Sequence, residues 1–296
     1  MPRIPDRLSA PDTIPVPTPG DRQLKTTLRP YFSTASFVRL PMRAGFRHIA
    51  EAGYDGVEVM VTHDPATQEP HQLAAAAKEF GIKVPVVHAP FLLITRRVWG
   101  TDPIGKIYRA VQVAETVEAP LVVVHPPYRW QVRFRRWIQD NLAEFSARTG
   151  VTVAVENMFP ITFGAERGLT FHAGQQLDEL DHNPYLVLDT SHAAVAGIDI
   201  LEAYRRYRDK IVHVHISNNA GKGWDSHLPV YDEGGVLPLD EFLRLLAEDG
   251  YRGTMSLELD LRPYLEDKDA LHEVLVRNRE FCEAHLPQRP KARTRS

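Results

Sequence analysis

Val187-Leu-Asp-Thr-Ser-His192 is the stretch of sequence on which both the fold and the site depend. In it an apolar run ends in Asp189, and His192 follows three residues later. A strand that stops at an acid and then turns so that a histidine faces back supplies two ligands that zinc, manganese and iron accept. D-x-x-H also arises by chance, but several other apolar runs of this chain likewise end in His or Glu.

Short apolar runs alternate with segments of helical spacing along most of the chain. The runs predict eight strands, at Tyr31–Ser36, Gly56–Met60, Val84–His88, Leu121–His125, Val151–Glu156, Tyr185–Asp189, Ile211–Ile216 and Thr254–Leu259. The segments predict helices at Met42–Ala52, His71–Phe80, Ile104–Glu118, Val132–Ala147, Gln175–Leu180, Ile200–Tyr207, Leu239–Ala247 and Ala270–Ala284. Eight strand–helix units over about 260 residues predict an α/β fold, a single-domain (β/α)8 TIM barrel. A doubly wound open sheet is the alternative, but the sequence lacks its glycine-rich phosphate turn.

Composition limits the class of protein and of partner. The 296 residues are 43% hydrophobic and 25% charged, as in ordinary globular proteins, and the net charge of −3 gives no general attraction to nucleic acid or to an anionic membrane. The single cysteine, Cys282, excludes an internal disulfide and predicts a cytoplasmic protein. No apolar run is long enough to span a membrane, so no membrane partner is expected. The oligomeric state stays open.

The two ends of the chain differ from the region between them. Residues 1–25 contain six prolines and little that could pack, so they predict a disordered arm. Residues 26–286 form the predicted barrel, and residues 287–296 predict a basic, flexible tail.

Polar side chains lie at most of the predicted strand ends, which form the active-site face of a TIM barrel. They are Glu58, His88, His125, Glu156, Asp189 with His192, His215 followed by Asp225 and His227, and Glu258. A single histidine at a strand end is usually a hydrogen-bonded core residue, but so many carboxylates buried together are costly without a cation. The sequence therefore predicts a metal site at this face, with His213 packed one layer below it.

Six short motifs carry a family resemblance that extends from Pro30 to Leu286. They are G-Y-D-G-V-E-V (Gly53–Val59), V-H-A-P-F (Val87–Phe91), V-V-V-H-P-P (Val122–Pro127), V-E-N (Val155–Asn157), L-D-T-S-H-A (Leu188–Ala193) and H-I-S-N (His215–Asn218). Together they resemble the xylose isomerase-like TIM-barrel superfamily. That superfamily holds sugar isomerases and epimerases as well as AP endonucleases of the endonuclease IV type, AP endonuclease family 2.

The isomerase and epimerase branch of this superfamily implies a sugar or sugar phosphate as substrate. It implies one manganese or cobalt ion, held by the equivalents of Glu156, Asp189, His215 and Glu258. Glu156 and Glu258 are then the catalytic carboxylates, which transfer a proton at the carbon next to a carbonyl. The G-Y-D-G-V-E phrase is closer to this branch, which is our leading hypothesis.

The endonuclease IV branch implies phosphodiester hydrolysis in nucleic acid by up to three zinc ions. Its nine metal ligands all have a match here, at His88, His125, Glu156, Asp189, His192, His215, Asp225, His227 and Glu258. However, F-S-T-A-S-F (Phe32–Phe37) replaces its first-strand G-x-H-x-S motif, and V-E-V-M-V-T-H-D-P (Val57–Pro65) replaces its DNA-contacting loop. A zinc phosphodiesterase is therefore the alternative, and a metal-binding barrel without catalysis is a third reading.

Five residues are expected to contact or support a substrate: Glu58, Phe91, Asn157, Lys222 and Trp224. Glu58 belongs to the phrase shared with the epimerase branch. Asn157 follows Glu156 and is placed to support it by a hydrogen bond. Lys222, just before the D-S-H segment, is interpreted as a phosphate ligand or as a flexible loop lysine. Phe91 and Trp224 are assigned to the pocket wall by analogy with the fold alone.

Overall fold

Eight parallel strands close into one barrel in sequence order, with β8 pairing back to β1. The computed structural model describes residues 28–91, 95–160, 171–172, 174–175 and 177–286. The strands are β1 (Pro30–Ser33), β2 (Gly56–Met60), β3 (Lys83–His88), β4 (Leu121–Val124), β5 (Thr152–Glu156), β6 (Leu186–Asp189), β7 (Ile211–Ile216) and β8 (Thr254–Leu257). This confirms the predicted TIM barrel. The predicted arm (1–25) and tail (287–296) lie outside the described residues.

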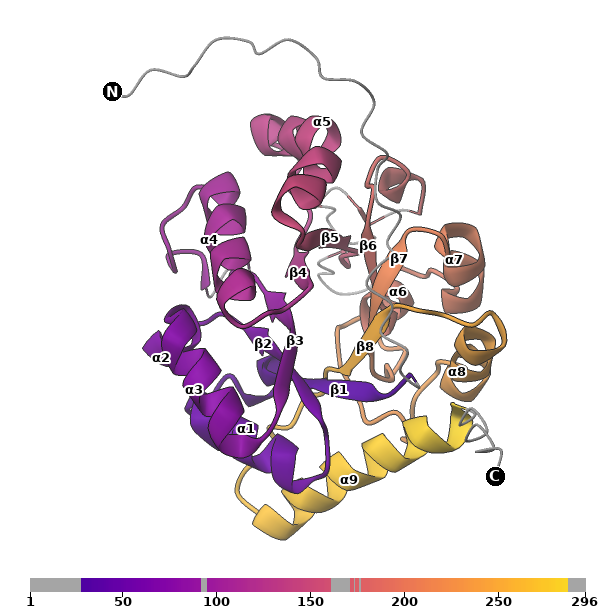
Figure 1. The fold of residues 1–296 in the computed structure, drawn as a ribbon. Coiled ribbons are helices and arrows are strands. Elements are labelled where there is room, and N and C mark those ends of the chain that lie inside the picture. Colours follow the sequence, from indigo (N-terminus) through magenta and orange to yellow (C-terminus); the bar gives the residue numbers. More distant parts are fainter. Residues whose placement is uncertain (1–27, 92–94, 161–170, 173, 176, 287–296) are drawn as a thin grey trace, which may run out of the picture.

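Helices surround the barrel (Figure 1). They are α1 (Met42–Glu51), α2 (Pro65–Gln68), α3 (Pro70–Phe80), α4 (Pro103–Thr116), α5 (Val132–Thr149), α6 (Thr190–Val195), α7 (Ile200–Tyr207), α8 (Leu239–Glu248) and α9 (Lys268–His285), with 3-10 turns η1 (Thr34–Phe37) and η3 (Leu177–Leu180). Within the described part of the chain, no helix combines the length and apolar character needed to cross a bilayer.

Aspartates begin several of the outer helices. Asp102 accepts hydrogen bonds from the backbone N–H groups of Ile104 (3.3 Å) and Gly105 (3.2 Å) at the start of α4. Asp199 and Asp267 cap α7 and α9 in the same way. Each cap satisfies donors that the first helical turn leaves free, which explains why these helices begin where they do.

Two predicted elements differ from the structure in type or by more than two residues, and one short helix beside the site was not predicted. The first strand ends at Ser33 and not at Ser36, because the Ser33 hydroxyl accepts from the N–H of Ala35 (3.2 Å) and starts η1. The helix predicted at Gln175–Leu180 is only the 3-10 turn η3. The short helix α6, directly after β6, was not predicted, because six residues are too few for a periodic pattern.

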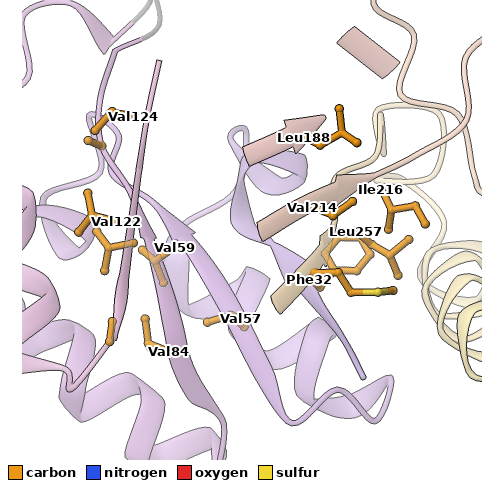
Figure 2. Packing of buried hydrophobic residues seen from close by; sticks show 14 of the residues in the cluster. Phe32, Val57, Val59, Val84, Val122, Val124, Leu188, Val214, Ile216 and Leu257 are labelled. Carbon is orange, nitrogen blue, oxygen red and sulfur yellow. The ribbon is translucent and has the colours of Figure 1, made fainter. Parts of the chain in front are cut away.

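Two separate apolar clusters pack against the two faces of the barrel wall. The larger cluster lies between strands and helices, and it includes Val57 and Val59 of β2 and Val122 of β4 (Figure 2). The smaller one fills part of the barrel interior and consists of Val86, Leu121, Val123, Ala154 and Val187, from β3 to β6. Side chains alternate between these faces along each strand, as parallel strands require.

The other part of the interior is polar. It is formed by Glu58 of β2, His213 and His215 of β7, and Thr254 and Ser256 of β8. Glu58, His213, His215 and Ser256 are all fully buried. The interior is therefore apolar along β3 to β6 and hydrogen-bonded on the opposite side.

Candidate metal centre

Residues two positions apart on a strand point to the same face, so most of the predicted ligands share a face with the interior apolar residues. Four of the five interior apolar residues of β3 to β6 lie two positions before one of these ligands, the pairs being Val86 and His88, Val123 and His125, Ala154 and Glu156, and Val187 and Asp189. In strands that run parallel around one barrel, these side chains must meet at the carboxyl-terminal mouth.

Three predicted carboxylate ligands meet around the Nδ1 atom of a fourth predicted ligand, His215. His215 Nδ1 lies 2.9 Å from Glu156 Oε1, 3.6 Å from Asp189 Oδ2 and 3.8 Å from Glu258 Oε2. Ligands about 2.0–2.2 Å from a common ion are separated by distances of this order. Asp189 Oδ2 and Glu258 Oε2 are buried and lack a hydrogen-bond partner among the described residues. Buried carboxylate oxygens without donors fit a cation, so these four side chains form a suitable divalent-metal site.

The cap of α6 fixes the orientation of Asp189. Its Oδ1 accepts from the N–H of His192 (2.7 Å), which leaves Oδ2 directed at the ligand group. Asn157 holds the backbone of the same residue: Asp189 N–H donates to Asn157 Oδ1 (2.7 Å), and Asn157 Nδ2 donates to Asp189 O (3.1 Å). Asn157 is 1% exposed. Asn157 therefore supports a predicted ligand, but through the backbone of Asp189 and not, as was expected, through Glu156. Its expected contact with a substrate stays a prediction.

A second ligand group shares Glu156 with the first. Glu156 Oε2 lies 3.4 Å from His88 Nε2 and 3.1 Å from His125 Nε2, while Oε1 faces His215. Burial raises the pKa of Glu156, but His215, His125 and His88 hold it well below its usual value. Burial lowers the pKa of His125 to about 4. A lowered pKa favours the neutral form of the imidazole, which is the form that binds a metal ion.

A third group is built on the loop after β7. Asp225 Oδ2 lies 2.8 Å from His227 Nε2 and 3.4 Å from His192 Nε2, and Ser191 donates its hydroxyl to Asp225 Oδ1 (2.6 Å). Burial lowers the pKa of His227, but Asp225 and Asp189 raise it to about 10. The carboxylates thus demand positive charge here, which either protons or a divalent ion can supply.

Backbone carbonyls set the orientation of three of these histidines. The Nδ1 atoms of His88, His192 and His227 lie 3.0, 2.9 and 2.9 Å from carbonyl oxygens of Ala89, Asn157 and Glu258. Each contact favours the tautomer with Nδ1–H, and it directs Nε2 toward the carboxylates. Such contacts are typical of metal-binding imidazoles. The structure therefore brings together all nine predicted ligands.

Glu58 lies below this centre and does not reach its mouth. Its Oε2 is 3.0 Å from His213 Nε2, and its Oε1 is 2.9 Å from His215 Nε2. It is 0% exposed and both its oxygens contact histidines, so its expected contact with a substrate stays a prediction. His213 was expected only to pack, yet it is hydrogen-bonded at both ring nitrogens, to Glu58 and to Thr254 Oγ1 (2.6 Å).

The other expected substrate contacts divide into two kinds. Phe91 stacks on Phe134 of α5, with ring centroids 5.7 Å apart, and packs against the core. Lys222 and Trp224 lie on the β7–α8 loop immediately before Asp225, with the ammonium group 5.8 Å from the indole centroid. Trp224 is 54% exposed. These two side chains remain accessible beside the third ligand group, whereas Phe91 is largely enclosed.

Sequence reasoning missed two polar residues near the centre. Ser191 donates to Asp225, and Ser217 Oγ lies 3.0 Å from His227 Nδ1. Ser191 is inside D-T-S-H and Ser217 inside H-I-S-N, so proximity to the motifs was the available signal. What the sequence could not indicate is which ligand each hydroxyl contacts.

The structure is a parallel barrel with a centre of histidines and carboxylates at its carboxyl-terminal mouth. A family model described as the xylose isomerase-like TIM barrel matches residues 46–279, and the chain belongs to this family. An uncharacterized protein of Mycobacterium tuberculosis is 35% identical over 285 residues, covering 89% of this chain and 99% of its own. Fructoselysine 3-epimerase of Shigella flexneri is 22% identical over 255 residues, covering 76% and 88%.

Three solved structures show the same fold at low sequence identity. A xylose isomerase domain-containing protein from Salmonella typhimurium has a TM-score of 0.65 at 18% identity, over 87% of this chain and 98% of its own. The 3-keto-D-glucoside 4-epimerase from E. coli has a TM-score of 0.59 at 19% identity, over 83% of this chain and 98% of its own. An AP endonuclease of family 2 from Brucella melitensis has a TM-score of 0.58 at 18% identity, over 81% of this chain and 99% of its own.

Proposed function

We propose that this protein is a divalent-metal-dependent isomerase or epimerase that acts on a sugar or a sugar phosphate. The observation that carries the proposal is the convergence of Glu156 Oε1, Asp189 Oδ2 and Glu258 Oε2 on His215 Nδ1. This ligand set includes two glutamates, and carboxylates can transfer a proton at the carbon next to a carbonyl. Similarity to a fructoselysine 3-epimerase supports the same reaction class.

The ligand set fits one divalent ion, with Mn²⁺ or Co²⁺ as the expected metal. When bound, such an ion supplies Lewis-acid polarisation of a carbonyl and its neighbouring hydroxyl, which makes the intervening C–H more acidic. Glu258 is the better placed of the two carboxylates to accept that proton, because histidines already contact both oxygens of Glu156. Glu156 is the partner carboxylate. Lys222 and Trp224 offer a cation and an aromatic face for a phosphate or a sugar ring.

A zinc phosphodiesterase is the second candidate, and the shared use of Glu156 favours it. The two carboxylate oxygens of Glu156 face two different ligand groups, one with His88 and His125 and one with His215. The Asp225 group adds a third position for an ion. Three adjacent ions would suit the charge that develops on a phosphodiester.

Deuterium exchange tests the leading proposal without knowledge of the specific sugar. The full chain, loaded with Mn²⁺ or Co²⁺, is incubated in D2O with a panel of ketoses and their phosphates. We expect deuterium at the carbon next to the carbonyl of at least one of them, detected by mass spectrometry. Exchange should stop after chelation and return when metal is restored.

Asp225→Asn separates the two candidates. It keeps the size of the side chain but weakens the third ligand group only, so an isomerase with one ion should retain its exchange activity. A phosphodiesterase should instead contain close to three zinc ions per chain, cleave a duplex with an abasic site, and lose that cleavage in Asp225→Asn. Cleavage together with absent deuterium exchange would overturn the isomerase proposal.

A further inference from the structure

A hydrogen-bonded chain runs through the polar part of the barrel interior, below the ligands. It passes from Thr254 Oγ1 to His213 Nδ1 (2.6 Å), from His213 Nε2 to Glu58 Oε2 (3.0 Å), and from Glu58 Oε1 to His215 Nε2 (2.9 Å). His215 Nδ1 then faces the ligand group. Glu58, His213 and His215 each have 0% exposure. Neither Glu58 nor His213 has a role in the reaction proposed above.

We propose that Glu58 is a positioning residue that, with His213, fixes His215 in the tautomer whose bare Nδ1 faces the metal. The inference rests on the metal requirement of the proposed function. His215 differs in this respect from His88, His192 and His227, whose Nδ1 atoms contact backbone carbonyls and whose Nε2 atoms face the carboxylates. For His215 the orientation is reversed, and a buried carboxylate replaces the carbonyl.

The reversal follows from where β7 places the ring. His215 lies between two carboxylates, with Glu156 Oε1 2.9 Å from Nδ1 and Glu58 Oε1 2.9 Å from Nε2. Without a fixed partner below, either nitrogen could carry the proton of the neutral ring. A carboxylate accepts hydrogen bonds and donates none, so Glu58 requires the proton to be on Nε2. Nδ1 is then left with a lone pair for the ion.

His213 keeps Glu58 in place by a hydrogen bond. With His213 and His215 both donating to it, Glu58 receives two hydrogen bonds in a volume closed to water. Thr254, the register partner of His213 on β8, contacts the other nitrogen of that ring and fixes its plane. A buried carboxylate hydrogen-bonded to a ligand histidine also makes the imidazole a stronger ligand.

Glu58, His213 and His215 could themselves be taken for a place to hold an ion, because their ligand atoms lie within 4.8 Å of one another. The separations of 2.9 to 3.0 Å are those of hydrogen bonds with shared protons. We assign these three side chains to the support of the metal site above them.

Glu58→Gln is the decisive change, because an amide of the same size also presents a donor. The NH2 group would donate to Nε2 of one of the two histidines and drive that ring to the Nδ1–H tautomer. On His215 this tautomer blocks the metal. We expect the affinity for Mn²⁺ or Zn²⁺, measured by competition with a chromophoric chelator, to fall about 10- to 100-fold. The number of ions bound at saturation should not change.

A matched control lies in the same layer of the barrel. Ser256 is the register partner of His215, is fully buried, and its hydroxyl has no hydrogen-bond partner among the described residues. Ser256→Ala should leave metal affinity within about twofold of wild type. Thr254→Val removes only the contact to His213 and should give a loss between those of Ser256→Ala and Glu58→Gln. It also keeps the test informative if Glu58→Gln does not fold.

Nitrogen NMR of histidine-labelled, zinc-loaded protein reads the tautomer directly, independently of catalysis. In wild type His215 should have a metal-bound Nδ1 and a protonated Nε2, and Glu58→Gln should reduce that signal. Wild-type affinity and an unchanged His215 signal in Glu58→Gln would overturn the inference, as would loss of one whole ion. Wild-type metal binding through Nδ1 without any deuterium exchange would instead contradict the proposed function and leave this inference standing. A wild-type chain that binds no metal would overturn both.

Discussion

Two glutamates of the same centre have very different surroundings. Glu156 has His88 and His125 at one oxygen and His215 at the other. Glu258 extends from the end of β8, and burial raises its pKa, although His215 and His227 oppose the shift. Because histidines contact both oxygens of Glu156, Glu258 is the stronger candidate for general base.

Glu258→Gln should therefore remove turnover while the chain stays folded. We expect the rate of deuterium exchange at saturating metal to fall by about 10² to 10⁴, because the amide cannot accept the proton. The control is Asp260→Asn, two residues further on, where the carboxylate pairs with Arg262 and points to solvent. Its exchange rate should stay near that of wild type. Comparable rates in both variants would exclude Glu258 as the base.

At the scale of single elements, the β6–α6 turn combines two roles in Asp189. One oxygen caps α6 and the other faces His215. Asp189→Asn should preserve the cap, since asparagine is an equally good N-cap residue, while it removes the ligand charge. Asp189→Ala should lose both and destabilise the metal-free chain by about 1 kcal/mol more than Asp189→Asn does. Urea unfolding with a chelator present measures this difference. Equal stabilities would show that the cap contributes nothing.

The loop between β3 and α4 depends on a buried lysine of α4. Lys106 donates from Nζ to the carbonyl oxygens of Pro90 (2.6 Å), Arg96 (2.9 Å) and Thr95 (3.3 Å), and it is 4% exposed. Burial lowers its pKa to about 8. Because this loop directly follows His88, Lys106 links a helix on the outside of the barrel to the ligand face.

Lys106→Met should make this link visible in the pH dependence of stability. At neutral pH the variant should lose about 1–3 kcal/mol, because buried carbonyls lose their donor. From pH 8 to 10.5 the unfolded wild type binds more protons at this lysine than the folded form, so its contribution to stability rises with pH. The gap between wild type and variant should therefore widen between pH 8 and 10, as measured by urea unfolding. Lys78→Met, at an exposed position of α3, is the control and should change stability by less than about 0.5 kcal/mol. A gap that narrows with pH would contradict this.

Elements with strong patterns were predictable from sequence, and those governed by one side-chain contact were not. The bounds of β2 and β7 match the predicted runs, because both are short apolar runs between clear turns. The end of β1 depends on one hydroxyl of Ser33. The contact of Glu58 with His213 and His215 joins β2 to β7, which are not neighbours in the barrel. Such contacts across the interior follow from barrel closure, which no local pattern encodes.

At the scale of the whole molecule, the barrel concentrates its charge on one side of the interior. The apolar cluster along β3 to β6 supports the mouth from below, whereas Glu58 and two histidines replace it near β2 and β7. The ligands converge from β3 to β8 and from the loop after β7. A cation at the mouth therefore interacts with most of the barrel wall at once, so metal binding and global stability must be linked.

Metal removal should consequently lower the melting temperature of the entire chain in one transition. An ion present at 100 times its dissociation constant stabilises the folded state by about 2.7 kcal/mol, which corresponds to roughly 5–10 °C for a domain of this size. Thermal denaturation with a chelator and with added Mn²⁺ or Zn²⁺ measures the shift. Glu258→Gln should reduce the shift, because one of the three carboxylate ligands around His215 is weakened, while Asp260→Asn should keep it. Identical melting curves with and without metal would mean that the buried carboxylates are balanced by protons alone, and the proposed ion would have no structural basis.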